Sequence, residues 1–318
     1  MKEKRKAYIL GAGVSGLVTG WMLSKNGWDV TLLEREKWWG GLAFTRKWDE
    51  FDLDFGPHIY HTVSKELEEL WEREFGDLFV KGEFWCKNVK GESLDEFYDY
   101  PLSFEAILEY PSDLRSKVLS EIKHVDEKKK SGAKSYRDYV QALVGPTLQD
   151  LFFEKYPQKI WGMTTEEMTA NWAPKRIELR EKKTPFYTGR WNAVGKYGSG
   201  CVLDRLAEQI KASGGKILLD CGVQEIIHTE NAITALKLAS GQTVQIKPDE
   251  IVISTIPINI LAFLFSIPCP LKFRGVISVA LAFKKPYVLP EGIHFLYYDA
   301  PDIIFHRISE QKKFSDAG

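Results

Sequence analysis

The sequence predicts an α/β fold in which a dinucleotide-binding domain with a parallel sheet is interleaved with a helical insert and a second, mainly antiparallel sheet that covers the cofactor. Three observations support this prediction. A glycine-rich turn joins an apolar strand to a helix near the N-terminus. Residues 103–155 have a helical pattern, and residues 223–246 and 276–308 contain short segments typical of strands.

The N-terminal turn has the spacing of a dinucleotide fingerprint. Residues 8–10 form a short apolar strand, residues 17–23 read as a helix, and the strand 29–33 ends at Glu34. The turn supplies the expected cofactor-binding residues Gly11, Gly13, Val14, Ser15 and Gly16. Gly11 permits the tight turn, Gly13 lets the backbone approach a pyrophosphate, and Gly16 lets the helix pack closely on the strand. The helix N-terminus offers N–H groups to the phosphates and Glu34 can accept from a ribose, so a Rossmann-like domain is predicted.

The residues after this acid favour FAD over NAD. A second glycine pair closely follows it, as in the two-dinucleotide-binding flavoproteins, which this segment resembles. The further expected FAD contacts are Glu34, Arg35, Gly40, Gly41, Leu42, Gly56, Pro57, His58 and Val223. The alternatives are an ordinary glycine loop, and a signal peptide formed by basic residues 2–6 and apolar residues 7–23. Glycines at fingerprint positions disfavour the signal peptide.

Composition restricts the class of partner. The chain has 318 residues, 44% hydrophobic and 27% charged, with a formal net charge of −1, so no basic excess argues for nucleic acid or an anionic membrane. The longest apolar stretch, 251–267, contains Pro257 and Asn259 and predicts a strand and a helix rather than a membrane span. The four cysteines lack metal-ligand spacing, so we expect free thiols, no metal site and a cytoplasmic location.

The remaining elements follow from periodicity. Residues 64–75 and 201–213 are amphipathic helices, residues 83–99 could form a hairpin, and the helical region 103–155 is broken at Pro111 and at 128–132. The predicted strands are 216–219, 223–227, 233–238, 243–246, 251–255, 276–283, 294–298 and 303–308. We therefore expect a cofactor domain at 1–96 and 191–260, a helical substrate insert at 97–190, and a substrate-side sheet at 261–318.

Several segments in order resemble the UDP-galactopyranose mutase family. Residues 56–62 (GPHIYHT) are similar to its histidine loop, and residues 152–161 with 172–177 to its substrate-helix signature. Residues 98–101 resemble the segment that meets the uracil, and residues 296–298 and 305–307 two strands that face the diphosphate.

The resemblance implies a particular use of FAD. In the family the N5 atom of the reduced flavin attacks the anomeric carbon of a UDP-sugar, and the adduct allows pyranose and furanose forms to interconvert without net redox change. The residues to which it assigns roles here are His58 against the flavin, Arg176, Arg307 and Tyr297 on the diphosphate, Trp161 on the sugar, and Tyr100 on the uracil. NAD(P)H as reductant and a homo-oligomer are further expectations. Ordinary roles, as surface ion pairs or core side chains, are the alternatives.

Two features depart from the family pattern. Leu102 and Ser103 stand where some members have an aromatic and an amide against uracil. Residues 309–318 look like mid-domain sequence, so we expect either a fragment lacking the segment that completes the flavin site or a natively short chain. A second reading, an FAD-dependent oxidoreductase of the amine oxidase or desaturase type, rests on the nucleotide half and on residues 196–213. A third is an inactive remnant.

Overall fold

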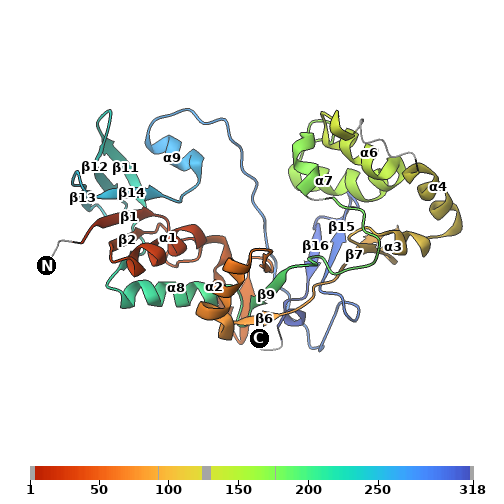
Figure 1. The fold of residues 1–318 in the computed structure, drawn as a ribbon, viewed down its shortest axis with the longest axis horizontal. Coiled ribbons are helices and arrows are strands. Elements are labelled where there is room, and N and C mark those ends of the chain that lie inside the picture. Colours follow the sequence, from red (N-terminus) through yellow and green to blue (C-terminus); the bar gives the residue numbers. More distant parts are fainter. Residues whose placement is uncertain (1–3, 92, 124–129, 176, 316–318) are drawn as a thin grey trace.

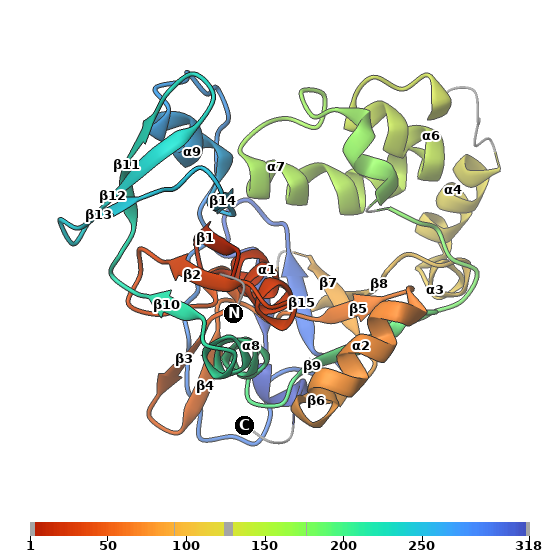
Figure 2. The same ribbon diagram turned by 60° about the vertical axis from the view of Figure 1, so that its left-hand side comes forward.

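The computed structural model describes residues 4–91, 93–123, 130–175 and 177–315. A parallel sheet with its helices lies at one end of the molecule, and a group of helices beside a mixed sheet lies at the other (Figure 1). Figure 2 shows the same arrangement turned, with α8 viewed nearly end-on below the parallel sheet.

The parallel sheet forms as the sequence predicts. Its order is β10 (Lys216–Leu218), β2 (Asp29–Leu33), β1 (Lys6–Leu10) and β14 (Ile251–Ser254), and all neighbouring pairs are parallel. Because side chains alternate along a strand, β1 buries Ala7 and Ile9 on one face and Tyr8 and Leu10 on the other. A strand covered on both faces needs a continuous apolar run, which explains its sequence.

Each face of this sheet is covered by predicted elements. Helices α1 (Val14–Lys25) and α8 (Gly200–Ala212) pack on the Ile9 face. The antiparallel sheet β11 (Val223–His228), β12 (Ile233–Leu238) and β13 (Thr243–Gln245) packs on the other, together with α9 (Ile258–Leu264). The predicted return of residues 251–255 to the first sheet is thus confirmed.

Two small sheets and a helix connect this region to the rest. Strands β3 (Thr45–Trp48) and β4 (Phe51–Asp54) form a hairpin. Strand β9 (Trp191–Gly195) lies between β5 (Tyr60–Thr62) and β6 (Phe79–Lys81), antiparallel to both. The amphipathic helix α2 (Lys65–Phe75) begins after Ser64, whose hydroxyl accepts from the Leu67 amide.

The helical insert has its own core. It contains α3 (Phe104–Leu108), α4 (Ser112–Ile122), α6 (Tyr136–Leu148), a π-helical stretch Gln149–Glu154 and α7 (Lys155–Trp161). Helix α6 begins with a capping box between Ser135 and Asp138. Val118, Val140 and Leu148 are fully buried in this core, so the predicted helical region 103–155 is confirmed over its described part.

The mixed sheet lies beside these helices. Its order is β16 (Arg307–Ser309), β15 (Phe295–Tyr298), β7 (Cys86–Lys90) and β8 (Glu96–Tyr100). Only β15 and β7 are parallel, and the other pairs are antiparallel. The predicted hairpin within 83–99 and the strand at 294–298 are confirmed, whereas the strand expected at 303–308 is shorter and shifted to 307–309.

The strand predicted at 276–283 is wrong. These residues run as an extended chain between α9 and β15 (Figure 1) and pair with no other described segment. Ile277, Val279 and Leu281 are 92%, 76% and 71% exposed. Alternation predicts a strand only where a neighbouring strand satisfies the backbone and a second layer covers the apolar face, and both are missing in the described part of the chain.

Replacing Gly16 by Ala should destabilise the parallel-sheet region. A Cβ at Gly16 would lie 2.0 Å from the Gly11 carbonyl oxygen, so backbone must move. We expect the free energy of unfolding to fall by about 1–3 kcal/mol in denaturant titrations. Gly275→Ala, where a Cβ meets nothing within 4 Å, is the matched control and should change little. Equal stability of the two variants would contradict this account of the turn.

The extended segment should be the first site of limited proteolysis. Lys272 and Lys284 are exposed and their backbone has no ladder partner among the described residues, whereas Arg205 lies within α8. We expect trypsin to cut after Lys272 or Lys284 before it cuts after Arg205, as read by mass spectrometry. Earlier cleavage at Arg205 would show that the segment is covered in solution.

Candidate functional site

The two glycine segments predicted to hold a dinucleotide lie against each other. Gly11 has a φ of +95°, and its amide donates to the Leu33 carbonyl at 2.8 Å, so the chain turns sharply at the carboxyl end of β1. The Gly40 amide donates to the Ala12 carbonyl at 2.8 Å, and a Cβ at Gly41 would lie 3.2 Å from the Gly13 Cα. Side chains on either segment would separate them.

Glu34 is fixed beside this turn. Its carboxylate accepts from the Ala12 amide at 2.7 Å and from the Glu36 amide at 2.9 Å. A carboxylate has further lone pairs, so Glu34 can still accept from a ribose hydroxyl. Val14 and Ser15 are exposed at the start of α1, where free N–H groups are available to an anion.

The other predicted FAD contacts lie around the same edge. Leu42 is 82% exposed in a short 3₁₀ turn that follows Gly40. Arg35 pairs with Glu36 at 2.8 Å, and a Cβ at Gly222 would lie 2.8 Å from the Arg35 Cβ. Val223, the first residue of β11, therefore begins next to Arg35. A dinucleotide fits this set, since it offers glycines for close approach, a helix N-terminus for phosphates and a carboxylate for a ribose.

The loop that contains His58 meets the mixed sheet. Gly56 has a φ of +87°, and a Cβ there would lie 3.0 Å from Nη2 of Arg307. Pro57, Tyr297 and Arg307 line a common cavity of about 90 Å³. The Nδ1 atom of His58 is buried without a hydrogen-bond partner among the described residues, as expected of a group that meets a ligand.

Tyr297 lies in a cluster of aromatic rings. Its ring centroid is 5.1 Å from that of Tyr156, 5.5 Å from that of Phe295 and 5.9 Å from that of Tyr100. Burial raises the pKa of Tyr297 well above the usual 10, although Arg307 acts in the opposite direction. The phenol therefore stays protonated and can donate a hydrogen bond.

Trp161 stands at the end of α7 and is 44% exposed. The Arg274 guanidinium lies 4.6 Å above its ring and donates to the Ile160 carbonyl at 3.3 Å. Nearby, the Lys159 ammonium donates to the carbonyl oxygens of Ala300 at 2.9 Å and Phe305 at 2.7 Å. Arg176, predicted as the second diphosphate ligand, lies outside the described residues.

Sequence reasoning did not identify Lys159 or Arg274 as site residues. Arg274 lies two residues before the strand predicted at 276–283, where no ligand was expected. Lys159 is one of many lysines. The sequence could have indicated Lys159 by its position alone, since it lies two residues before Trp161 in the segment 152–161. The contacts that position them, Arg274 with Ile160 and Lys159 with Phe305, join residues more than a hundred positions apart in the sequence.

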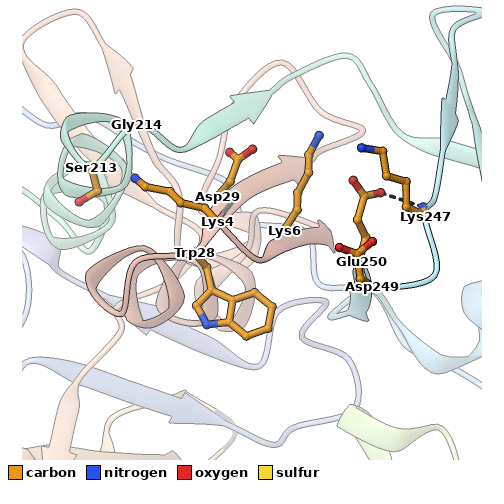
Figure 3. A pocket seen from close by; sticks show the side chains of 9 residues that line it. All are labelled: Lys4, Lys6, Trp28, Asp29, Ser213, Gly214, Lys247, Asp249 and Glu250. Carbon is orange, nitrogen blue, oxygen red and sulfur yellow. Dashed lines mark hydrogen bonds between the residues drawn. The ribbon is translucent and has the colours of Figure 1, made fainter. Parts of the chain in front are cut away.

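A different cavity, of about 320 Å³, lies at the amino ends of β1 and β2 (Figure 3). Its lining mixes lysines (Lys4, Lys6, Lys247) with carboxylates (Asp29, Asp249, Glu250), and the Lys247 amide donates to the Glu250 carboxylate at 2.9 Å. Ligands of open α/β sheets bind at the carboxyl ends of the strands, so we place the candidate site at the glycine edge instead.

Comparisons with known proteins agree with this architecture. The family described as flavin containing amine oxidoreductase matches residues 14–310. A dTDP-fucopyranose mutase of Escherichia coli is 24% identical over 184 residues, 55% of this chain and 46% of that protein. A probable UDP-galactopyranose mutase of Klebsiella pneumoniae is 22% identical over 219 residues, 65% of this chain and 54% of that protein.

A solved structure shows the same fold. The crystal structure of reduced UDP-galactopyranose mutase aligns with a TM-score of 0.71 at 16% identity, covering 99% of this chain and 71% of that one. This likeness confirms the predicted α/β fold class.

No helix in the described ranges is both long enough and apolar enough to cross a bilayer.

The curated relatives are longer than this chain, which spans about half of their length (46% and 54%). The family match, in contrast, extends over most of the 318 residues and includes the helix that follows the glycine turn, the histidine loop and β15. The chain belongs to the flavin-containing amine oxidoreductase family.

Proposed function

We propose that the protein is a flavin-dependent nucleotide-sugar mutase that interconverts the pyranose and furanose forms of a UDP-hexose. The observation that supports this most strongly is the position of Arg307. Its guanidinium lies over Gly56, at the start of the loop that leads to His58, and it has no carboxylate partner among the described residues. A buried tyrosine hydroxyl, that of Tyr297, lines the same cavity.

The glycine edge would hold FAD. The N-terminus of α1 and the Gly11–Gly13 turn would take the pyrophosphate, and Glu34 the ribose. The Gly40–Gly41 pair would let the cofactor pass, and His58 would lie against the flavin. When bound and reduced, the flavin supplies a nucleophilic nitrogen for the anomeric carbon of the sugar.

The residues of the mixed sheet would hold the nucleotide sugar. When the bond between C1 and the phosphate breaks, the diphosphate gains negative charge. Arg307 can stabilise that charge with two parallel, charge-assisted hydrogen bonds, because a guanidinium stays protonated and has a planar fork of donors. Tyr297 can donate a further hydrogen bond, and Trp161 offers an exposed ring to the sugar. Tyr100 would lie toward the uracil, and Arg176 would be a second arginine on the diphosphate.

The remaining parts of the proposal concern context. We propose NAD(P)H as the reductant of the flavin, a cytoplasmic location and a homo-oligomeric state. These rest on the family resemblance of the motifs and on the composition of the chain.

A second candidate is an FAD-dependent oxidoreductase, which the family description itself favours. It rests on the glycine edge and on the segment 196–213, which is fixed at the start of α8 by hydrogen bonds from the Ser199 amide and hydroxyl to Asp54. The two functions differ in the fate of electrons. Substrate alone would reduce the flavin of an oxidoreductase, whereas a mutase would return its flavin unchanged.

Replacing Arg307 by Ala should weaken UDP binding by about 10- to 100-fold, the usual contribution of hydrogen bonds to a charged group. Isothermal titration of UDP into the purified, FAD-supplemented protein measures the change, and the absorption spectrum reports retained flavin. Arg73→Ala, on the exposed surface of α2, is the matched control. Unchanged UDP affinity in the Arg307 variant would refute the mutase proposal.

Replacing Tyr297 by Phe should weaken UDP binding by about 3- to 10-fold, since it removes one neutral hydrogen-bond donor and keeps the ring. Because burial holds the pKa of this phenol above its usual value, the loss should be the same at pH 6 and pH 9. Tyr287→Phe, an exposed tyrosine outside the aromatic cluster, serves for comparison. If affinity for UDP is retained in full, Tyr297 is a core residue only.

A further inference from the structure

Basic side chains from three separate parts of the chain surround Tyr156. Lys159 lies one turn further along α7 and Arg274 comes from the extended segment. His306 directly precedes β16, and Arg307 is the first residue of that strand. The His306 ring centroid is 6.0 Å from that of Tyr156. The positive charges of Arg307, Arg274 and Lys159 all act on His306, and those of Arg307 and Arg274 also act on Tyr156. We call Lys159, Arg274, His306 and Arg307 the basic cluster.

The backbone holds His306 in place. The Tyr298 amide donates to its carbonyl at 2.9 Å, and the Lys159 ammonium donates to the preceding carbonyl, that of Phe305, at 2.7 Å. The imidazole itself makes no hydrogen bond to another described residue. Within the described part of the chain, neither ring nitrogen is therefore occupied by a partner.

The charges near His306 are mostly of one sign. The groups that act on it are Tyr156 and Lys159 from α7, Arg274 from the extended segment, and its chain neighbour Arg307. The nearby carboxylates are Asp299 and Asp302, which act on Lys159, and Asp299 is already paired with Lys90. Burial and the three cations lower the pKa of His306, so its ring is neutral in the free protein at neutral pH.

An anion bound within the cluster reverses this balance. Negative charge close to the imidazole favours the protonated form, just as the three cations disfavour it. The protonated ring donates from both nitrogens, whereas a neutral ring donates from one.

We propose that His306 takes up a proton when a diphosphate binds within the basic cluster, and so becomes an additional, pH-dependent donor to that anion. The inference rests on the proposed function, since it assumes that a nucleotide diphosphate is the ligand. Linkage between proton uptake and binding determines the direction of the pH dependence. Affinity should rise as the pH falls from 8 to 6, by at most about tenfold per pH unit between the pKa values of His306 in the free and bound protein.

The probe must not titrate in the same range. The terminal phosphate of UDP has a pKa of about 6, as phosphate monoesters do, and would confuse the result. UDP-galactose carries a diphosphate esterified at both ends and has no such group. It is therefore titrated calorimetrically into the wild type, His306→Gln and the control His228→Gln, an exposed histidine on β11. Each titration is run at pH 6.5 in two buffers with different heats of ionisation.

We expect the wild type and the His228 variant to take up a substantial fraction of one proton on binding, and the His306 variant to take up almost none. Binding of UDP-galactose without proton uptake by the wild type, or uptake that persists in His306→Gln, would overturn the inference and leave the proposed function intact. Absence of UDP-galactose binding to the wild type would overturn both.

A second measurement uses the wild type alone and so does not depend on whether the His306→Gln variant folds. The imidazole Cε1–H resonance of His306 is titrated by NMR in the wild type, alone and with saturating UDP-galactose. We expect a pKa below 6.5 in the free protein and an increase on binding. An unchanged value would also overturn the inference.

Discussion

The close contact of two glycine segments determines where the candidate site can form. Gly40 hydrogen-bonds to the residue between Gly11 and Gly13, and a Cβ at Gly41 would lie only 3.2 Å from the Gly13 Cα. The chain that leaves this contact enters the β3–β4 hairpin, where Thr45 accepts from the Gly200 amide at 2.7 Å and Asp54 accepts from the Ser199 amide at 3.1 Å. The start of α8 is thus fixed to the same edge as the start of α1.

The substrate side depends on strand register instead. The parallel pairing of β15 with β7 sets Tyr297 opposite Asn88, and the antiparallel pairing with β16 sets Arg307 opposite Tyr297. A buried ion pair between Lys90 and Asp299 lies at the end of the same sheet. A shift by one residue would turn Arg307 away from Gly56, because side chains alternate between the faces of a sheet.

Local patterns predicted much of this fold and only part of the site. The strand–turn–helix start and the antiparallel strands 223–246 were predictable because their periodicity and turn residues are local. The segment 276–283 was not, since its alternation gives no information on whether a partner strand is present. Strand β9, which lies between strands β5 and β6, was missed because its five residues do not alternate between buried and exposed positions. Tyr297, Arg307 and the loop before His58 were predicted and come together. The basic cluster was not predicted, because it is assembled by contacts between distant segments.

The Lys159 ammonium donates to neutral carbonyl oxygens, those of Tyr298, Ala300 and Phe305, rather than to a carboxylate. Its charge is therefore held in place by neutral acceptors, while Asp299 and Asp302 also act on it. Together with Arg274 and Arg307 it gives a region of positive potential on a chain whose formal net charge is −1. Such a region attracts dianionic solutes over about one Debye length, so the rate at which they are captured should depend on ionic strength even though the protein as a whole is nearly neutral.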